Sequence, residues 1–345
     1  MTHATTPPRG RGTRPLEISV IVIGYQQAHV LELSLLALLG QDFDGPWEII
    51  LVDDSSTDGT FDRLRPHLQA TNLPVVYAWQ PDLGDRQAHA RNHGIALSRG
   101  RVLLFLDGDI VPNSDLVRRH ATTQAARPGL LAGNRLWRNW EADLARLGSA
   151  EDKLTALRTT TASNDPECRR HEHNEQRWRP RLLHSRLPWR VCFGCHVSVP
   201  YSPEVVFDEQ MPGWGCGDAE FACRLYEELH LPVGYDPDLL AWHVESANTV
   251  FNVFRRNRHD EVVRYLRQLL YFIDKYPDLR LDQAMTMGMD RLILTASDRW
   301  TVVPRGQGQP AHETLRFARD WLTAHGLGQP GTSPDPKASA GGDST

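Results

Sequence analysis

Runs of hydrophobic residues and stretches with helical apolar spacing alternate along the first 110 positions of this chain. Four short apolar runs predict buried strands, at residues 16–23, 47–52, 75–79 and 101–106. Three intervening segments predict helices, over residues 30–39, from residue 58 onward and over residues 87–97. This strict alternation predicts an α/β fold in which a mostly parallel sheet is flanked by helices on both faces.

The alternation stops after Asn113, and the pattern that follows is less regular. Residues up to 188 predict an irregular, polar section, after which strand character returns at residues 191–199 and 239–243. Further helices are expected near residue 219, over residues 250–271, around Asp290 and over residues 313–324.

These patterns predict the domain organisation. The main α/β domain is expected over residues 15–250, as an N-terminal half at 15–115 and a second half at 116–250. A helical C-terminal extension is expected over residues 251–325. The polar, Pro- and Gly-rich ends at residues 1–14 and 326–345 are expected to be disordered.

Composition narrows the class of protein. A chain of 345 residues that is 40% hydrophobic can bury a full core, and its formal net charge of -5 disfavours nucleic-acid binding. No apolar segment approaches the roughly 20 residues that span a bilayer, and residues 1–14 lack the hydrophobic region of a secretory signal. We therefore expect a cytoplasmic protein without an integral membrane segment, with five reduced cysteines. A homo-oligomer is compatible with these features.

Arginines are concentrated between residues 135 and 190. Such a charge-rich stretch predicts a solvated surface, with a face for an anionic substrate as the alternative.

Carboxylates follow the second and fourth predicted strands, where ligands bind in parallel α/β sheets. Asp53 and Asp54 end the second strand, and Asp107 and Asp109 flank a glycine at the end of the fourth. Residues two apart in an extended chain point to the same side, so Asp107 and Asp109 are expected to project together. Hard oxygen ligands of this kind suit a divalent cation that itself holds phosphate oxygens. The alternative is a polar turn in which Asp109 caps the next helix.

Phosphate-binding glycine motifs are missing from the sequence. Neither Gly-x-Gly-x-x-Gly nor Gly-x-x-x-x-Gly-Lys-Ser/Thr follows the first strand, which disfavours a dinucleotide-binding fold and excludes a P-loop. A metal on Asp109 is therefore the natural group to neutralise phosphate.

Five motifs, in order, resemble the family 2 glycosyltransferases of GT-A fold over residues 17–248. They are the first strand with Gly24-Tyr25, Val52-Asp-Asp-Ser-Ser-Thr-Asp-Gly-Thr60, Ala90-Arg-Asn-His-Gly-Ile-Ala96, Leu106-Asp-Gly-Asp109 and a longer motif that runs from Phe207-Asp-Glu through Gly213-Trp-Gly-Cys-Gly-Asp218-Ala-Glu-Phe221 to Arg224-Leu225. The last resembles the acceptor-side motif of galactosyl- and N-acetylgalactosaminyl-transferase domains, including bacterial chondroitin-polymerase modules. The resemblance assigns residues 15–115 to a nucleotide-sugar donor and residues 116–250 to the acceptor.

For the donor side, the resemblance implies a nucleotide-diphospho-sugar, with a UDP-sugar favoured. Asp54 would bind the base, Arg91 the base or the diphosphate, and Asp107 the ribose or the metal. Asp109 and His243 would ligate Mn2+ or Mg2+, and a histidine ligand favours Mn2+. The alternatives are a turn between Asp54 and Ser56, an exposed helix arginine at position 91 and a structural histidine at position 243.

For the acceptor side, the resemblance implies a hexosyl- or N-acetylhexosaminyl-transferase in which Asp218 is the catalytic base of an inverting, one-step transfer. The alternative role of Asp218, compatible with the first, is N-cap of a helix that begins near Ala219. Trp214 would stack on a sugar ring or pack in the interior. Gly217 replaces the glutamate that the family usually has before this aspartate, which puts the class of acceptor in doubt.

Two rival functions are kept. A sugar-phosphate nucleotidyltransferase also uses metal-binding aspartates, but it requires a basic, Gly-rich loop that the segment after Gly24 lacks. A non-catalytic nucleotide- or carbohydrate-binding protein on a degenerate transferase fold is favoured by Gly217 and disfavoured by intact Asp109, Asp218 and His243. The sequence identifies neither the sugar nor the acceptor.

Overall fold

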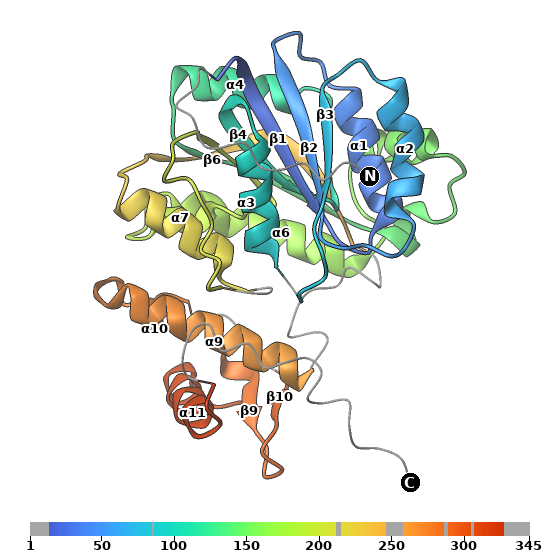
Figure 1. The fold of residues 1–345 in the computed structure, drawn as a ribbon. Helices are drawn as coiled ribbons and strands as arrows, with labels where there is room; N and C mark the ends of the chain where they lie inside the picture. The colour runs from blue at the N-terminus through green and yellow to red at the C-terminus, as the bar shows by residue number, and fades with distance from the viewer. Residues whose placement is uncertain are drawn as a thin grey trace. The chain divides into compact units, whose positions relative to one another are not determined.

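The computed structural model describes residues 14–84, 86–211, 215–245, 258–285, 289–304 and 307–327. Two compact units divide the chain. The first comprises the described residues within 1–82, 89–207 and 218–249, and the second those within 83–88, 208–217 and 250–345 (Figure 1).

The N-terminal half of the first unit has the predicted strand–helix alternation. Its elements are β1 Leu16–Gly24, α1 Ala28–Leu39, β2 Trp47–Asp53, α2 Thr60–Ala70, β3 Val75–Trp79, α3 Gln87–Leu97 and β4 Gly100–Asp107. Each predicted strand and helix is present here, because short apolar runs and helical spacing are local signals.

The rest of the first unit is more regular than predicted. Its elements are β5 Ile110–Pro112, α4 Leu116–Ala126, β6 Leu130–Asn139, a π-helix Trp140–Leu144, α5 Ala150–Thr159, α6 Pro166–Leu182, a 3-10 helix Pro188–Val191, β7 His196–Pro200, α7 Gly217–Glu227 and β8 Val233–Glu245. The prediction of an irregular section up to residue 188 was therefore wrong. The strand predicted at residues 191–199 begins only at His196.

Helices α4, α5 and α6 and strand β6 were all missed in the middle section, and two of these helices, α5 and α6, have start signals in the sequence. Ser149 and Asp152 form a capping box at the start of α5. Asp165 accepts hydrogen bonds from the backbone N–H groups of Glu167 and Cys168, ahead of a proline in the first turn of α6. These caps satisfy N–H groups that a helix start leaves unpaired, so they outweigh the low hydrophobicity of the segment.

Eight strands form one sheet in the order β3-β2-β1-β4-β7-β6-β8-β5. β1 pairs in parallel with β2 and β4, β2 with β3, and β6 with β8. β7 is antiparallel to β4 and β6, and β5 is antiparallel to β8. The sheet is therefore mixed, and the expected GT-A type of fold, with helices on both faces, is present.

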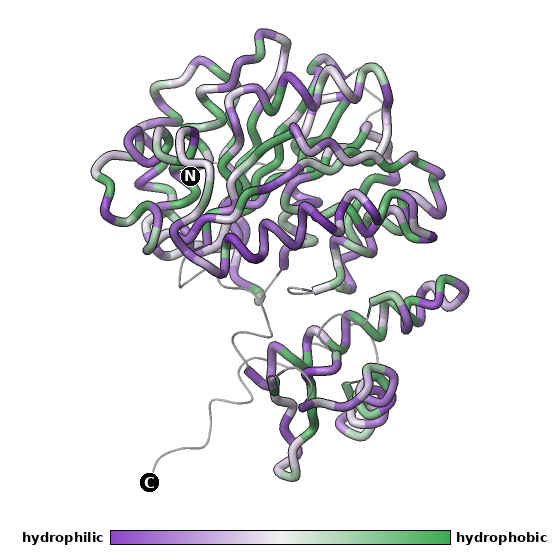
Figure 2. Tube along the Cα trace, turned by 180° about the vertical axis from the view of Figure 1, so that it is seen from behind, coloured by the Kyte–Doolittle hydropathy of each residue, from purple (hydrophilic) through white to green (hydrophobic). Residues whose placement is uncertain are grey.

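Alternate residues of β1 pack on opposite faces of the sheet. Val20 and Val22 share a buried cluster with Leu31 of α1 and with residues of α2 and α4, and α1 and α2 run side by side in Figure 1. On the other face Ile21 contacts α3 so closely that a Cβ added at Gly94 would lie 2.4 Å from Ile21 Cγ2. Figure 2 shows the resulting concentration of hydrophobic residues along the central strands.

The second unit contains the described part of the C-terminal extension. Its elements are α9 His259–Lys275, a 3-10 helix Pro277–Leu279, α10 Leu281–Ala284, a 3-10 helix Met289–Arg291, β9 Leu292–Leu294, β10 Trp300–Val302 and α11 Ala311–Ala324. β9 and β10 form an antiparallel hairpin that the prediction of a purely helical extension missed. Leu266 and Phe272 of α9 and Trp300 of β10 are buried in its core. The first residues of the helix predicted at 250–271 lie outside the described residues.

None of the helices in the described part of the chain combines the length and the apolar composition needed to cross a membrane.

A chain of buried neutral groups ties α4 to the centre of the sheet. His120 Nε2 lies 3.0 Å from His196 Nε2, and His120 Nδ1 lies 2.9 Å from the hydroxyl of Ser198. His196 Nδ1 lies 3.1 Å from the carbonyl oxygen of Asn134 and donates to it in the tautomer that satisfies every member. Burial lowers the pKa of His120 to about 3 and that of His196 well below its ordinary value. Both imidazoles are therefore neutral in the native state.

This network predicts acid sensitivity. The unfolded chain binds protons on both histidines below pH of about 6.5, whereas the native state excludes them, so the free energy of unfolding falls as the pH drops from there toward the folded pKa values. Each histidine contributes up to about 1.4 kcal/mol per pH unit. Urea unfolding at pH 7.5, 6 and 5 should show a shallower pH dependence in His120→Asn than in the wild type. The control variant is His29→Asn, because His29 is exposed. If the unfolding free energy of His120→Asn varied with pH as steeply as that of the wild type, the histidine network would not be the source of the acid sensitivity.

Candidate active site

A buried guanidinium joins two of the predicted carboxylates at the carboxyl end of the sheet. Arg91 of α3 donates from Nη2 to Asp107 Oδ1 at 2.8 Å and from Nη1 to Asp218 Oδ1 at 3.0 Å. Its side chain is only 4% exposed, while those of Asp107 and Asp218 are each 31% exposed. The alternative of an exposed helix arginine is therefore wrong. Asp107 lies 16 positions from Arg91 in the sequence, whereas Asp218 lies 127 positions away.

The electrostatics of the three groups are interdependent. Burial raises the pKa of Asp107, Arg91 lowers it, and the negative charges of Asp109 and Asp218 raise it, with a net upward shift. For Arg91, burial lowers the pKa, but Asp218 and Asp107 more than offset this and keep the guanidinium charged. One buried cation thus holds carboxylates together that would otherwise repel one another.

Asp218 lies in the first turn of α7, which begins at Gly217 rather than near Ala219 as predicted. A carboxylate in the first turn interacts favourably with the N-terminal end of the helix dipole. The side chain of Asp218 is partly exposed at this helix terminus.

Gly194, which the sequence analysis did not single out, makes room for this ion pair. A Cβ added at Gly194 would lie 2.3 Å from Asp218 Oδ1 and 3.1 Å from Arg91 Nη2. A glycine inside an apolar, strand-like run is a signal of close approach by another group. That signal was present in Cys192-Phe-Gly-Cys195.

The two predicted metal ligands, Asp109 and His243, also lie close together. β4 ends at Asp107, and the chain turns so that Asp109 immediately precedes β5. β5 pairs with β8 in the register Ile110 to His243, which places His243 Nε2 3.3 Å from Asp109 Oδ2. Burial lowers the pKa of His243, but the Asp109 carboxylate raises it, with a net upward shift. The ring of His243 lies 4.4 Å from that of Trp137, centroid to centroid.

The facing atoms of this pair are of the right chemistry for a metal ion. His243 Nε2 and Asp109 Oδ2 lie 3.3 Å apart, and the buried Asp109 Oδ1 has no hydrogen-bond partner among the described residues. A carboxylate oxygen and an imidazole nitrogen are suitable Mn2+ ligands. Within the described residues, no group of three or more His, Cys, Asp or Glu side chains forms a protein-only metal cage. An ion held by Asp109 and His243 would therefore take its other ligands from substrate and water.

The local turn after β2 is made by Asp53 and not by Asp54. Ser56 N donates to Asp53 Oδ1 at 2.7 Å, and Tyr77 OH donates to the other oxygen of Asp53. Asp54 is buried, and its Oδ1 accepts from Gln80 Nε2 at 2.6 Å. The alternative of a turn between Asp54 and Ser56 is therefore wrong. Trp214 lies outside the described residues.

A further charged residue, Arg135, lies near the Asp109–His243 pair. Arg135 of β6 donates from Nη2 to Glu175 at 2.8 Å and from Nη1 to the Cys195 thiol at 2.8 Å. Burial raises the pKa of Cys195 to about 12, so it remains a thiol. Arg179, one of the arginines predicted to be solvated, is buried instead and donates to the carbonyl oxygen of Val191. No sequence pattern signalled these contacts, because their partners come from separate elements.

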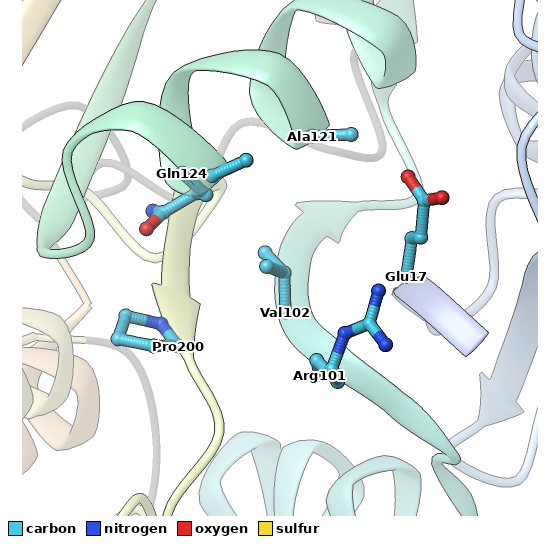
Figure 3. A pocket seen from close by; sticks show the side chains of 7 residues that line it. Glu17, Arg101, Val102, Ala121, Gln124 and Pro200 are labelled. Atoms are coloured by element: carbon cyan, nitrogen blue, oxygen red, sulfur yellow. The ribbon is translucent and has the colours of Figure 1, made fainter. Parts of the chain in front are cut away.

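One cavity, of about 210 Å³, lies at the opposite end of the sheet (Figure 3). It is lined by residues at the starts of β1 and β4, by α4 and by the end of β7, including Glu17, Arg101, Gln124 and Pro200. Ligands of parallel α/β sheets bind outside the carboxyl ends of the strands, so this cavity is not the candidate site.

The fold and the site together define a GT-A type of transferase. The model of the family "Glycosyl transferase family 2" matches residues 19–196, which is slightly more than half of the 345 residues. The chain belongs to this family.

Curated relatives are named as glycosyltransferases, and this chain is a glycosyltransferase. The uncharacterized glycosyltransferase YfnE of Bacillus subtilis (strain 168) is 30% identical over 294 residues, which cover 77% of this chain and 72% of that protein. Validoxylamine A glucosyltransferase of Streptomyces hygroscopicus subsp. jinggangensis (strain 5008) is 27% identical, with 89% and 68% covered. A chondroitin synthase of Pasteurella multocida (strain Pm70) is 24% identical over 61% of this chain, which spans only 23% of that synthase.

Solved structures share the fold. The mannosyltransferase PcManGT from Pyrobaculum calidifontis, in complex with GDP-Man and Mn2+, superimposes with a TM-score of 0.50 at 16% identity and covers 96% of this chain and 81% of its own. S. aureus TarS 1-349 in complex with UDP has a TM-score of 0.50 at 16% identity, with 90% of this chain and 92% of its own covered.

The close approach at Gly194 yields a stability prediction. Gly194→Ala places a methyl group against Asp218 and Arg91, and overpacking of this kind costs about 1–3 kcal/mol of unfolding free energy. At Gly217, no described heavy atom lies within 4 Å of an added Cβ, so Gly217→Ala is the matched control. Denaturant unfolding should show a loss for Gly194→Ala and little change for the control. If Gly194→Ala and Gly217→Ala were equally stable, the chain around Gly194 would accommodate the methyl group without loss of stability, and the prediction would be wrong.

Proposed function

We propose that this glycosyltransferase is metal-dependent and inverting, and that it moves a sugar from a nucleotide-diphospho-sugar, with a UDP-sugar favoured, to an acceptor hydroxyl. The observation that carries the proposal is the arrangement of Arg91 between Asp107 and Asp218, next to the Asp109–His243 pair. It combines a cation, a metal-type ligand pair and a partly exposed carboxylate at the ligand-binding edge of the sheet.

The donor would bind along the ends of β2 and β4. Asp54 offers a carboxylate to the N–H group of a base, and Arg91 offers charge to the diphosphate. The complexes of TarS with UDP and with UDP-GlcNAc support a uridine nucleotide, while the complex of PcManGT with GDP-Man shows that other nucleotides occur on this fold. Asp107, already bound to Arg91, would fix that guanidinium and contact the ribose or the metal.

Mn2+ or Mg2+ would be held by Asp109 and His243. When bound, the ion stabilises negative charge that develops on the departing diphosphate. The histidine favours Mn2+, and the Mn2+ complex of PcManGT supports the same choice. Arg91 contributes a fixed positive charge to the same end, at no cost of reorganisation during the reaction.

Asp218 would act as the general base. As the acceptor oxygen bonds to the anomeric carbon, its proton passes to the Asp218 carboxylate, and the bond between that carbon and the diphosphate oxygen breaks. Attack opposite to the leaving group inverts the configuration in a single step. The hydroxyl of the acceptor would approach Asp218, whose side chain is 31% exposed. Trp214 stays a predicted sugar-stacking residue.

The metal pair can be tested directly. A panel of nucleotide-sugars should reveal Mn2+-stimulated hydrolysis of a UDP-sugar, and Asp109→Asn and His243→Ala should each raise the Mn2+ concentration for half-maximal rate by about 10- to 100-fold. His67, which lies 3.0 Å from Glu32 in a comparable pair on the outer helices, supplies the control His67→Ala. If no nucleotide-sugar binds with any divalent metal, the proposed function is wrong.

The base can be separated from donor binding. Asp218→Asn keeps the shape of the side chain but removes the proton acceptor, so turnover should fall by about 100- to 10,000-fold while UDP affinity stays near the wild-type value. The control is Asp115→Asn, because Asp115 also lies at the N-terminal end of a helix and pairs with an arginine, Arg119. Calorimetric UDP titration and steady-state rates give the two readouts. Parallel loss of UDP binding would demote Asp218 to a structural role.

A further inference from the structure

A short segment, residues 204–207, is held between the helices that carry Arg91 and Asp218. On the α3 side, Asn92 Nδ2 donates to the carbonyl oxygen of Phe207 at 2.9 Å, and Phe207 N donates to Asn92 Oδ1 at 2.7 Å. The side-chain amide of Asn92 thus forms hydrogen bonds with both backbone polar groups of Phe207, which is 115 positions away in the sequence. The sequence analysis gave Asn92 no role of this kind.

The ring of Phe207 packs against aromatic rings and against Arg91, which pairs with Asp218. It stacks on Phe221 of α7 with centroids 3.9 Å apart and planes 5° from parallel. It also meets Phe105 of β4 edge to face, at 5.2 Å. The guanidinium carbon of Arg91 lies 5.1 Å from the Phe207 centroid, within the range of a cation–π contact.

α7 also forms hydrogen bonds with residues 204–207. Arg224 donates from Nη1 to the carbonyl oxygen of Glu204 at 3.1 Å and from Nη2 to that of Val206. α3 and α7 are therefore joined twice, once directly by the Arg91–Asp218 ion pair and once through residues 204–207.

We propose that Asn92 is a positioning residue that, by fixing Phe207, sets the place of Asp218 relative to Arg91. The inference rests on the proposed function, in which Asp218 is the base. A single ion pair to a partly exposed carboxylate leaves α7 free to pivot, because both side chains can rotate about it. A second attachment through a flat aromatic stack removes that freedom. Two neighbouring residues of α3 therefore have different roles. Arg91 binds Asp218 through its charge, and Asn92 fixes the position of Phe207, on which α7 packs.

Loss of this attachment should lower turnover more than donor affinity. Displacements of about 1 Å at a reacting group can reduce rate about 100-fold. Asn92→Ala should lower kcat for the UDP-sugar by about 10- to 100-fold. UDP affinity should change by less than about threefold, since the Asp54 and Asp109 side chains keep their partners.

Gln124 provides a matched control. Its side-chain amide grips the backbone of Gly129 in the same two-way manner, at 2.9 and 3.1 Å, but it lines the cavity at the opposite end of the sheet. Gln124→Ala should lower the thermal midpoint as Asn92→Ala does and leave kcat unchanged. Phe207→Leu keeps the backbone grip of Asn92 but removes the aromatic stack, and it should lower kcat like Asn92→Ala.

Hydrogen–deuterium exchange supplies a readout that needs no turnover. Amides in the first turns of α7 should exchange faster in Asn92→Ala than in the wild type and in Gln124→Ala. Wild-type exchange in α7, wild-type kcat in Asn92→Ala, or an equal kcat loss in Gln124→Ala would each overturn the inference. If the wild-type enzyme turns over no nucleotide-sugar, the proposed function fails, whereas faster exchange in α7 would still support the attachment itself.

Discussion

The candidate site depends on the burial of one positive charge. A buried guanidinium without partners would cost several kcal/mol, so Arg91 requires carboxylates within hydrogen-bonding distance. Those carboxylates come from the end of β4 and the start of α7, and both elements must converge on α3 for the fold to be stable. Gly194 allows the approach, because any side chain there would occupy the position of Asp218. The stability of the fold and the geometry of the candidate site therefore depend on the same contacts.

The mixed topology of the sheet brings the second pair of groups to this edge. Parallel strands β1, β2 and β4 all end at the ligand-binding side, which explains why acids at their ends lie near one another. β5 then pairs antiparallel with β8, and that register, rather than any local motif, places His243 beside Asp109. A one-residue slip would turn the histidine to the other face of the sheet.

Two polar clusters inside the first unit differ in what they require. The His120–His196 chain is neutral, and its ring nitrogens all have partners, so it contributes to stability without a ligand. The Asp109–His243 pair has buried atoms without partners among the described residues, which is costly unless a ligand binds. This contrast separates a structural histidine network from a candidate binding site.

The sequence by itself determined the alternating elements up to Asp107, the acids at the strand ends and the candidate residues of the site, because strand runs, helical spacing and short motifs are local. It missed α4, β6, α5 and α6, and the capping residues of α5 and α6 outweigh the polar composition of those two helices. Only the tertiary structure decided which groups meet: Arg91 and Asp218 are 127 positions apart, and Asn92 and Phe207 are 115 apart. Contacts across such separations follow from sheet order and helix packing, which no local pattern in this chain encodes.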